Sequence, residues 1–558
     1  MSVPGSTLRF PWLDSYPEGV PAVAPPHHAD ALSQFRAALT AAPDAPAILY
    51  FDTRISYRQL QRSSDALAAA LGARGFCRGD RLAVYLQNTP QFLIAVLAAW
   101  KLGGSVVTIN PMNREYELAK LLRDAQPRVL ICEDSLREEV VARLPADMAL
   151  PPIILVTTQH ELQGRNDARV LNGPKRDPAT LADSLLALID SHLGEAPAAF
   201  TPAPTDIAAI VYTSGTTGQP KGALISHSNI VHVTTAHGHW YALQSGAAVL
   251  CAAPLFHITG LLGHMALAWS MAAPLVLCYR FEPGVVIDAI AEHQPQYTAN
   301  AITAYIALMN SPQLDRQRLA SLKTVTSGGA PVPPSVALQV EQALGWPILN
   351  GYGLTETSSG VVIMPRGAAG RVDPVSGALS VGVALSGVEV WIAAEDGARL
   401  GHDEIGEVVI KGPMVSPGYW QKPEETAEAM RADGLRTGDI GFLDRHGWLY
   451  IVDRKKDMIN ASGYKVWPRE VEDVLYAHPA VREAAVIGIG DAYRGETVKA
   501  VVSLRADVQA SAEQLRTWCR ERLAAYKVPR EIAFVAELPK SGTGKILRRL
   551  LRTPETSA

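Results

Sequence analysis

The hydrophobic pattern in the first half of the chain alternates between helical and strand periods. Residues 56–75 (SYRQLQRSSDALAAALGARG) place apolar side chains at helical spacing and end at a glycine, which predicts an amphipathic helix. The apolar runs at 81–86, 153–157 and 208–213 are typical of short buried strands. This alternation predicts an α/β fold in which helices flank stacked, largely parallel sheets.

The pattern changes after Val381 and indicates a β-rich subdomain over about residues 381–453. Short strands there are separated by turn signals at Glu395-Asp396-Gly397 and at Arg445-His446-Gly447. Another change follows near Arg454, where a charged stretch begins.

The C-terminal part of the chain predicts a compact α+β unit. Helices are expected over Pro468–Tyr476 and residues 511–526, with two apolar strands between them. The charged stretch 453–457 is the predicted hinge. We therefore expect an N-terminal domain of residues 1–455 and a small mobile C-terminal domain of residues 456–558.

Composition and charge narrow the class of protein. The 558 residues are 48% hydrophobic and 19% charged, which favours several folded lobes and excludes disordered, collagen-like and coiled-coil chains. Lys and Arg total 51 against 55 Asp and Glu, a net charge of −4. No global basic field is available for nucleic acid, so any phosphate site has to be local.

Compartment signals favour the cytoplasm. The N-terminus lacks the basic start and apolar core of a secretory signal. The five cysteines show no CxxC or Cys/His ligand pattern and are expected to be reduced thiols. The stretch from Gly222 to Tyr279 has no Asp, Glu, Lys or Arg, but His257, His264, Pro254 and Pro274 interrupt it, which favours a buried core over a transmembrane span. Peripheral membrane contact and oligomerisation both remain compatible with this composition.

The segment Tyr212–Gly222 (YTSGTTGQPKG) carries the strongest chemical signal. It follows a predicted strand and contains three glycines and four Ser or Thr hydroxyls, whose N–H and O–H groups can surround phosphate oxygens while Lys221 adds a positive charge. The Walker A pattern does not fit, which excludes a P-loop NTPase. The predicted ATP-phosphate residues are Thr213, Ser214, Gly215, Thr216, Thr217, Gly218 and Lys221.

This segment resembles the signature of the adenylate-forming superfamily of acyl-CoA synthetases, luciferases and peptide-synthetase adenylation domains. Residues 432–456 also resemble the fatty acyl-CoA synthetase signature, with Leu435 where that signature usually has Trp, a departure that bears on chain length rather than reaction class. Further matching motifs follow in the family's order: Ser327–Pro331, Gly351–Thr357, Thr437–Asp439, Asp453-Arg454, Ser462–Lys465 and Pro539–Lys545.

The resemblance implies an ATP-dependent carboxylic acid:CoA ligase that forms an acyl-AMP and releases pyrophosphate and AMP. Joining a carboxylate to the α-phosphate brings two anions together, so the site needs cations and aligned donors. Lys545 is expected to bridge these anions, with His257 beside the carboxylate and Thr355 donating to the α-phosphate. Thr213 and Glu356 are the expected Mg²⁺ contacts, because hard oxygen ligands suit that ion.

The resemblance also assigns the nucleoside. Tyr352 would stack on adenine, Asp439 would accept both ribose hydroxyls and Arg454 would steady the same sugar. The residues implied for the nucleoside are Gly328, Gly329, Ala330, Pro331, Gly351, Tyr352, Gly353, Asp439 and Arg454.

The second half-reaction needs different surroundings, which the family provides by rotating its C-terminal domain. Lys456 stands at the hinge position, and rotation would withdraw Lys545. The loop that would then line the CoA tunnel contains Ser462, Gly463, Tyr464 and Lys465.

The acid is most consistent with a medium- or long-chain fatty acid. The N-terminal segment WLDSYPEGVPA (12–22) resembles bacterial long-chain ligases, and small residues at Ala299, Ala301, Ala304 and Gly353 leave room for a chain. Aryl acids such as cinnamate or benzoate are the alternative, because related aryl ligases share every nucleotide motif.

Four other interpretations are weaker. An amino-acid-activating enzyme would place an aspartate near His257, and residues 254–260 contain none. A luciferase has no positive support, and a catalytically inactive binding module is disfavoured because every charged motif residue is present. A zinc site among the histidines of the uncharged stretch lacks acidic and supporting residues.

Overall fold

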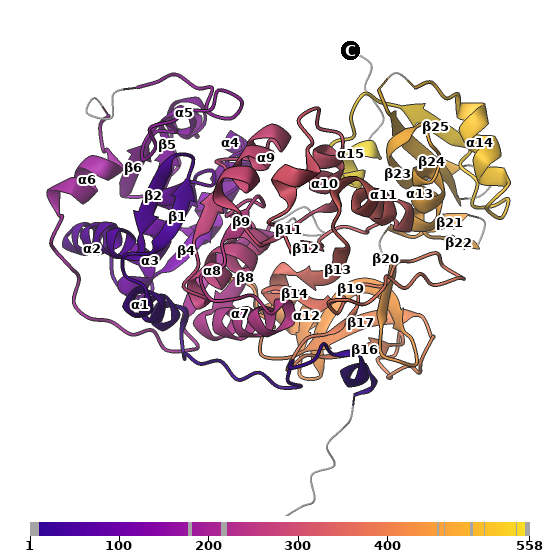
Figure 1. Ribbon diagram of the computed structural model, residues 1–558, viewed down its shortest axis with the longest axis horizontal. Helices are drawn as coiled ribbons and strands as arrows, with labels where there is room; N and C mark the ends of the chain where they lie inside the picture. The colour runs from indigo at the N-terminus through magenta and orange to yellow at the C-terminus, as the bar shows by residue number, and fades with distance from the viewer. Residues whose placement is uncertain are drawn as a thin grey trace, which may run out of the picture.

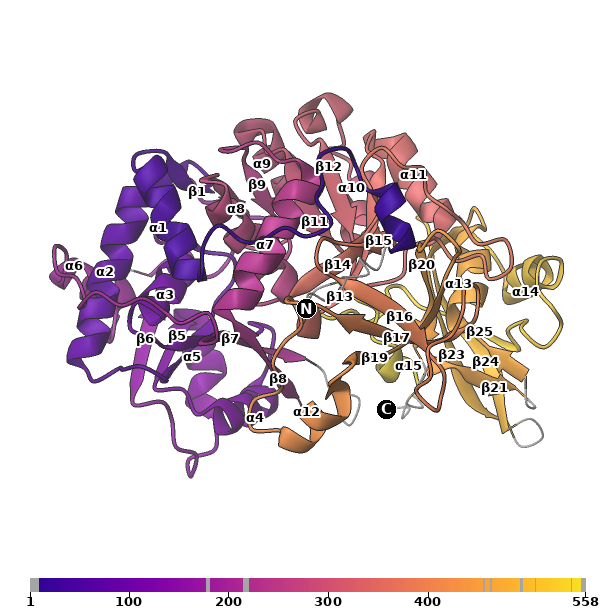
Figure 2. The same ribbon diagram turned by 90° about the horizontal axis from the view of Figure 1, so that it is seen from below.

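The computed structural model has four β-sheets within the residues it describes, arranged with helices as an α/β molecule (Figures 1 and 2). The six-stranded sheet lies at one end, in indigo and purple, and the C-terminal sheet lies at the other, in yellow. This arrangement confirms the predicted fold class. The described residues are 10–176, 181–213, 220–454, 457–461, 464–491, 495–506, 508–542 and 544–552.

The six-stranded sheet has the order β6-β5-β3-β4-β7-β8, parallel except for the antiparallel pair β7/β8. Leu82 and Val84 of β3 pack into the main core, whereas Ala83 and Tyr85 pack into a second core with α4. Alternate side chains thus enter different cores, and helices cover both faces. The strands are β3 (Arg81–Tyr85), β4 (Ser105–Thr108), β5 (Val129–Glu133), β6 (Ile153–Thr157), β7 (Ile207–Thr213) and β8 (Lys221–Ser226). The helices are α2 (Tyr57–Ala73), α3 (Pro90–Lys101), α4 (Glu115–Ala125), α5 (Asp134–Glu139), η2 (Val141–Arg143) and α6 (Leu185–Ser191).

The nine-stranded sheet has the order β15-β14-β13-β12-β11-β9-β10-β1-β2, with parallel central strands and antiparallel edges. The strands are β1 (Pro46–Tyr50), β2 (Thr53–Ser56), β9 (Val249–Cys251), β10 (Leu275–Leu277), β11 (Tyr297–Asn300), β12 (Thr324–Ser327), β13 (Ile348–Leu354), β14 (Ser359–Ile363) and β15 (Val383–Ala384). Its helices are η1 (Pro11–Ser15), α1 (Ala31–Ala41), α7 (His227–Tyr241), η4 (Thr259–Ala266), α8 (Leu267–Ser270), α9 (Pro283–His293), α10 (Ile302–Met309), η5 (Arg316–Leu319), α11 (Pro334–Leu344) and η6 (Thr355–Thr357).

The uncharged stretch from Gly222 to Tyr279 is mostly buried and contributes strands to both of these sheets. It forms β8, α7, β9, η4, α8 and β10, and most of its apolar side chains belong to the main core. The helix η4 is a π-helix, which the sequence pattern does not predict. Among the helices in the described ranges, none combines the length and apolar character that a bilayer crossing requires.

The five-stranded sheet of β16–β20, which lies between the two large sheets and the C-terminal unit along the sequence, is antiparallel. Its strands are joined by turns that contain Gly397 and Gly447, both with positive φ, at the predicted turn signals. The elements are β16 (Glu389–Ala393), β17 (Gly406–Lys411), α12 (Pro423–Ala429), β18 (Met430–Arg431), β19 (Gly434–Leu443) and β20 (Leu449–Arg454).

The C-terminal sheet contains a long antiparallel pair, β23 and β24, and a parallel edge strand, β25. The helix predicted over residues 511–526 ends at Arg520, because the chain turns back to enter β25, where Glu531 pairs with Lys499. The elements are β21 (Ile459–Ala461), β22 (Tyr464–Val466), α13 (Pro468–Tyr476), β23 (Val481–Asp491), β24 (Gly495–Leu504), α14 (Ala512–Arg520), β25 (Glu531–Phe534) and α15 (Arg548–Leu551).

Candidate active site

The two ends of the predicted phosphate loop lie side by side. Thr213 closes β7 and Lys221 opens β8, and the two residues pair in register. The Thr213 hydroxyl donates a hydrogen bond to the Lys221 carbonyl oxygen at 3.4 Å. The remaining predicted residues of the loop lie outside the described part of the chain: Ser214, Gly215, Thr216, Thr217 and Gly218.

Glu356 reaches the same region from the short helix η6, which follows β13 and lies against β8. Gly353 of β13 is required there, because a Cβ at this position would overlap the carbonyl oxygen of Ser359. The turn is closed by Leu354, whose N–H donates to the Thr357 hydroxyl at 2.7 Å. Thr355 and Glu356 therefore stand at the end of β13, both partly exposed.

Tyr419 joins Glu356 to Lys221. Its hydroxyl donates to Glu356 Oε1 at 2.8 Å, and the Lys221 ammonium lies 5.4 Å from the centre of its ring. Burial raises the pKa of the Tyr419 phenol, and the negative charge of Glu356 raises this pKa further, so the hydroxyl stays a donor. The sequence does not predict Tyr419, because a tyrosine after Pro417-Gly418 resembles an ordinary turn residue.

The oxygen donors near Lys221 suit a magnesium ion. Glu356 contributes a carboxylate and Thr213 a hydroxyl, which are hard ligands of the kind Mg²⁺ prefers. Glu356 Oε1 accepts the Tyr419 hydroxyl, while Oε2 accepts no hydrogen bond from any described residue. The donor set therefore fits the predicted metal.

Tyr352 and Asp439, both predicted to hold the nucleoside, contact each other. The Tyr352 hydroxyl donates to Asp439 Oδ2 at 2.6 Å, and Asp439 is only 4% exposed. The backbone N–H of Asp439 donates to the Thr437 hydroxyl at 3.1 Å. Arg454 pairs with Asp439 in the β19/β20 register, but its side chain lies outside the described part.

The turn after β12 brings Gly328–Pro331 against β13 and against the C-terminal unit. An added Cβ at Gly328 would lie 3.0 Å from the Gly351 carbonyl oxygen. Gly329 has a φ of +76°, and an added Cβ there would lie 3.4 Å from the Lys545 ammonium nitrogen. Of the predicted residues Gly328, Gly329, Ala330, Pro331 and Gly351, Gly329 thus borders the end of the Lys545 side chain, and Gly328 lies against Gly351.

Lys545 is presented by a tight loop of the C-terminal unit. The Ser541 N–H donates to the Lys545 carbonyl oxygen at 2.7 Å, and the Lys545 N–H donates to the Ser541 hydroxyl at 3.2 Å. The loop is docked on the N-terminal part of the chain, because the Thr303 hydroxyl donates to the Gly544 carbonyl oxygen at 3.1 Å.

His257 lies close to Lys545 at the start of the segment that leads into η4. Burial lowers the pKa of its imidazole, and the positive charge of Lys545 lowers it further, to about 3. The ring is therefore neutral at neutral pH, and Nδ1 accepts the Thr259 N–H at 3.3 Å. Gly260 lets the chain pass closely over the Pro254 carbonyl, where a Cβ would overlap it.

Two of the other histidines in the uncharged stretch have structural partners. His264 Nε2 accepts the Ala299 N–H at 2.9 Å, and His237 Nε2 lies 2.8 Å from the Gly360 carbonyl oxygen. Across the described ranges, no group of three or more His, Cys, Asp or Glu side chains is arranged to hold a metal ion.

The residues predicted for the thioester step fall mostly outside the described part. Lys456, Ser462 and Gly463 are not described, and Tyr464 and Lys465 are described only as backbone of β22. Their predicted roles remain predictions.

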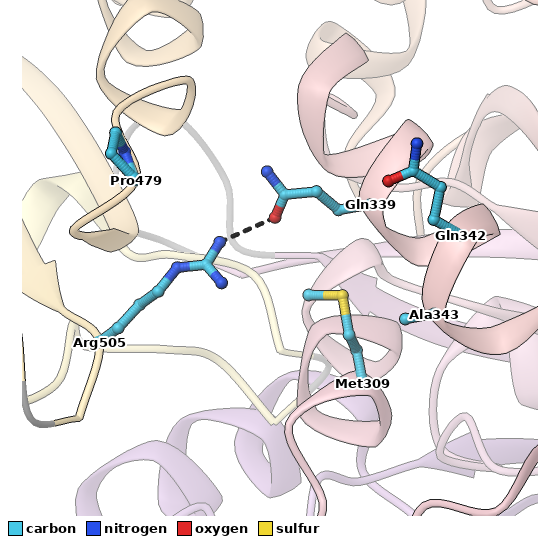
Figure 3. A pocket seen from close by; sticks show the side chains of 6 residues that line it. All are labelled: Met309, Gln339, Gln342, Ala343, Pro479 and Arg505. Atoms are coloured by element: carbon cyan, nitrogen blue, oxygen red, sulfur yellow. Dashed lines mark hydrogen bonds between the residues drawn. The ribbon is translucent and has the colours of Figure 1, made fainter.

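A cavity of about 470 Å³ opens where the C-terminal unit meets α10 and α11 (Figure 3). Arg505 crosses this junction and donates to Gln339 Oε1 at 2.8 Å. No predicted site residue lines the cavity, so it lies apart from the cluster around Lys545. The lining residues are Met309, Gln339, Gln342, Ala343, Pro479 and Arg505.

Comparisons with known proteins find matches over nearly the whole chain. The family model "AMP-binding enzyme" matches residues 35–420, and "AMP-binding enzyme C-terminal domain" matches residues 470–545. A long-chain-fatty-acid–CoA ligase of Bacillus subtilis is 36% identical over 565 residues, which cover 98% of each chain. A feruloyl-CoA synthase of an Amycolatopsis species is 33% identical over 511 residues, covering 91% of this chain and 96% of the other.

A solved structure shows the same fold. The crystal structure of ATP-bound MatB from Rhodopseudomonas palustris has a TM-score of 0.82 and 28% identity, and the match covers 94% of this chain and 98% of that one. The family models together span most of the chain. The chain belongs to the AMP-binding enzyme family.

Proposed function

We propose that this ATP-dependent, AMP-forming acyl-CoA ligase acts on medium- or long-chain fatty acids. The observation that carries the ligase chemistry is the position of Lys545, which reaches from the C-terminal unit to Gly329 and whose charge lowers the pKa of the His257 imidazole. A single cation placed there can neutralise a carboxylate and an α-phosphate at the moment they are joined.

In the first half-reaction, a carboxylate oxygen of the acid attacks the α-phosphorus of ATP and the bond to pyrophosphate breaks. Lys545 neutralises the two reacting anions, and Thr355 donates to the α-phosphate. His257, held neutral, sits beside the carboxylate without adding a second positive charge. The catalytic contribution is therefore charge neutralisation and in-line positioning.

ATP is held at both of its ends. Lys221 and the loop from Thr213 to Gly218 bind the phosphates, with Mg²⁺ on Glu356 and Thr213 neutralising pyrophosphate when it is bound. Asp439 accepts the ribose hydroxyls, and the Tyr352 hydrogen bond fixes its carboxylate. Tyr352, Gly351 and Gly353 border the adenine with the Gly328–Pro331 turn, and Arg454 supports the sugar.

In the second half-reaction, the CoA thiol loses its proton, its sulfur attacks the acyl carbonyl carbon, and AMP leaves. In the proposed mechanism Lys545 occupies the space beside the acyl-AMP, so thioester formation requires it to withdraw. We place the hinge of this rotation at Lys456 and the CoA tunnel at Ser462–Lys465, with the C-terminal domain beginning after residue 455.

The fatty-acid preference is supported by the relatives and by small residues near Lys545. The Bacillus subtilis relative is a long-chain-fatty-acid–CoA ligase. Ala301 Cβ lies 3.9 Å from the position of a Cβ at Gly544, in the loop that carries Lys545. The feruloyl-CoA synthase relative keeps an aryl acid as the second candidate.

The test is an acyl-CoA product assay across C6–C18 fatty acids, cinnamate, ferulate and benzoate. Each buried methylene contributes about 0.8 kcal/mol, so kcat/KM is expected to rise about fourfold per carbon until the pocket ends. Fatty acids should exceed every aryl acid. A flat response to chain length with fast aryl turnover would replace the fatty acid by the aryl alternative.

We also propose a cytoplasmic location. It is supported by the five cysteines, each of which carries a free thiol and four of which are buried.

A further inference from the structure

The side chain of Tyr419 contacts both of the opposite charges that flank the phosphate region. Lys221 and Glu356 both contact Tyr419, one through the ring face and the other through the hydroxyl. No ion pair joins Lys221 to Glu356 directly among the residues that the structure describes. Opposite charges attract each other, so without Tyr419 we expect the Lys221 ammonium and the Glu356 carboxylate to form an ion pair.

The backbone around Tyr419 is anchored to both elements that carry these charges. On one side, the Ser416 N–H donates to the Glu356 carbonyl oxygen at 2.8 Å. On the other side, the Trp420 N–H donates to the Gly222 carbonyl oxygen at 2.7 Å, and the Leu224 N–H donates to the Gly418 carbonyl oxygen at 2.9 Å. Tyr419 therefore has a fixed position between η6 and β8.

Two local features hold the side chain at that position. The Tyr419 N–H donates to the Thr426 hydroxyl at 2.9 Å, which ties the residue to the first helix after it, α12. Gly418 has a φ of +156°, and a Cβ there would lie 2.7 Å from Thr426 Cγ2, so the close approach of this turn to α12 requires glycine.

We propose that Tyr419 is a positioning residue that keeps Lys221 and Glu356 from pairing with each other. Its hydroxyl holds one oxygen of Glu356, which leaves the other for the metal, and its ring supports the Lys221 ammonium for phosphate. Without the ring, the Lys221 ammonium and the Glu356 carboxylate form an ion pair, and neither remains available to ATP and its metal. The inference rests on the proposed roles of Glu356 and Lys221 in binding Mg²⁺ and phosphate.

Two substitutions separate the hydroxyl from the ring. Tyr419→Phe keeps the contact of the ring with Lys221 and removes only the hydrogen bond to Glu356. Tyr419→Leu removes both contacts and keeps an apolar, though smaller, side chain. Tyr16→Phe is the matched control, because the Tyr16 hydroxyl also donates, at 2.7 Å, but to the backbone carbonyl of Ala384, away from the site.

The readout is ATP binding by calorimetry without acid or CoA, with and without Mg²⁺, together with KM for ATP and kcat for adenylation. For Tyr419→Phe, we expect ATP affinity without Mg²⁺ to stay within about twofold of wild type. The Mg²⁺ concentration that gives half of the Mg²⁺-dependent increase in ATP affinity should rise about tenfold, which is the size typical of supporting metal-site contacts. For Tyr419→Leu, ATP affinity should fall in both conditions. Tyr16→Phe should change neither quantity.

Glu356→Gln distinguishes failure of this inference from failure of the proposed site. If Glu356→Gln leaves the Mg²⁺ dependence unchanged, the metal role of Glu356 is wrong. If Glu356→Gln shifts it and Tyr419→Phe does not, Tyr419 has no positioning role. Thermal unfolding of each variant identifies loss of folding, and Tyr419→Phe, which keeps the packed ring, decides the question should Tyr419→Leu not fold.

Discussion

Lys545 and Glu356 carry opposite charges and reach the site from different parts of the chain. Lys545 belongs to the loop after β25, and Glu356 to the turn after β13. Both side chains are partly exposed, so water can screen them until ATP and the acid exclude it. Each charge therefore acts fully only in the loaded site, where the neighbouring His257 imidazole stays neutral.

The first prediction concerns Lys545→Ala. Adenylation should fall about 10²–10³-fold, the typical loss for one well-placed charge contact, whereas pre-formed acyl-AMP should still react with CoA at a nearly normal rate. Pyrophosphate release and conversion of acyl-AMP measure the two steps separately. Arg549→Ala, an exposed cation of the same segment, is the control and should change neither. Equal losses of both steps in Lys545→Ala would contradict the assignment.

The sequence predicts single site residues better than the contacts between them. Tyr352 and Asp439 are predicted as separate adenine and ribose contacts, yet their side chains share a hydrogen bond. Tyr419 belongs to no motif, and its role depends on a fold that places it between β8 and η6. Such contacts join residues far apart in sequence, so a local pattern contains no signal for them.

At the scale of elements, the predicted strands are present and two helices differ from expectation. Strands occur at 81–85, 153–157 and 207–213, as predicted, because a short run of apolar residues is typical of a buried strand. The π-helix η4 is not predicted, since a stretch without charged residues has no polar face from which its period can be read. The helix expected over 511–526 ends early because β25 pairs with β24, which is a tertiary requirement.

The element that follows Lys545, α15, is tied to the rest of the C-terminal unit by Arg548. Its guanidinium donates to the two carboxylate oxygens of Glu472 at 3.1 and 2.6 Å, and it lies 3.6 Å from Asp457. Glu472 is buried and also accepts the Val486 N–H at 2.7 Å. This bidentate pair fixes the segment that presents Lys545.

The second prediction is that Arg548→Gln destabilises the folded chain and slows adenylation. It leaves Glu472 buried with one partner fewer, which should lower the free energy of unfolding by about 1.5–3 kcal/mol. Urea unfolding and pyrophosphate release measure the two effects. Arg549→Gln, at an exposed neighbouring position, should be near neutral. An Arg548→Gln variant as stable and as active as Arg549→Gln would show that the pair positions nothing.

At the scale of the whole molecule, the structure describes one arrangement of the C-terminal unit. The contacts of Thr303 with Gly544 and of Gln339 with Arg505 join this unit to the rest of the chain. Both are partly buried hydrogen bonds, each contributing only about 0.5–1.5 kcal/mol. The buried Arg469 guanidinium also donates across the junction, to the carbonyl oxygens of Ile451 and Val332. Contacts of this size can be exchanged for others, as a rotation between two half-reactions requires.

The last prediction tests that rotation with Lys456→Pro. Proline fixes φ near −65° and removes the backbone N–H, so it restricts the turn that the chain would make at this position. Adenylation, which uses the arrangement already described, should stay within a few-fold of wild type, while conversion of acyl-AMP to acyl-CoA should nearly stop. Lys456→Ala, which removes the side chain but keeps the backbone free, should retain both steps. Lys456→Pro and Lys545→Ala would then impair opposite half-reactions. A mixture of the two variants would restore acyl-CoA formation to the extent that acyl-AMP made by Lys456→Pro is released and then bound by Lys545→Ala. If Lys456→Pro instead slowed both steps alike, no rotation about residue 456 would separate them, and Lys545 would have to share the site with CoA.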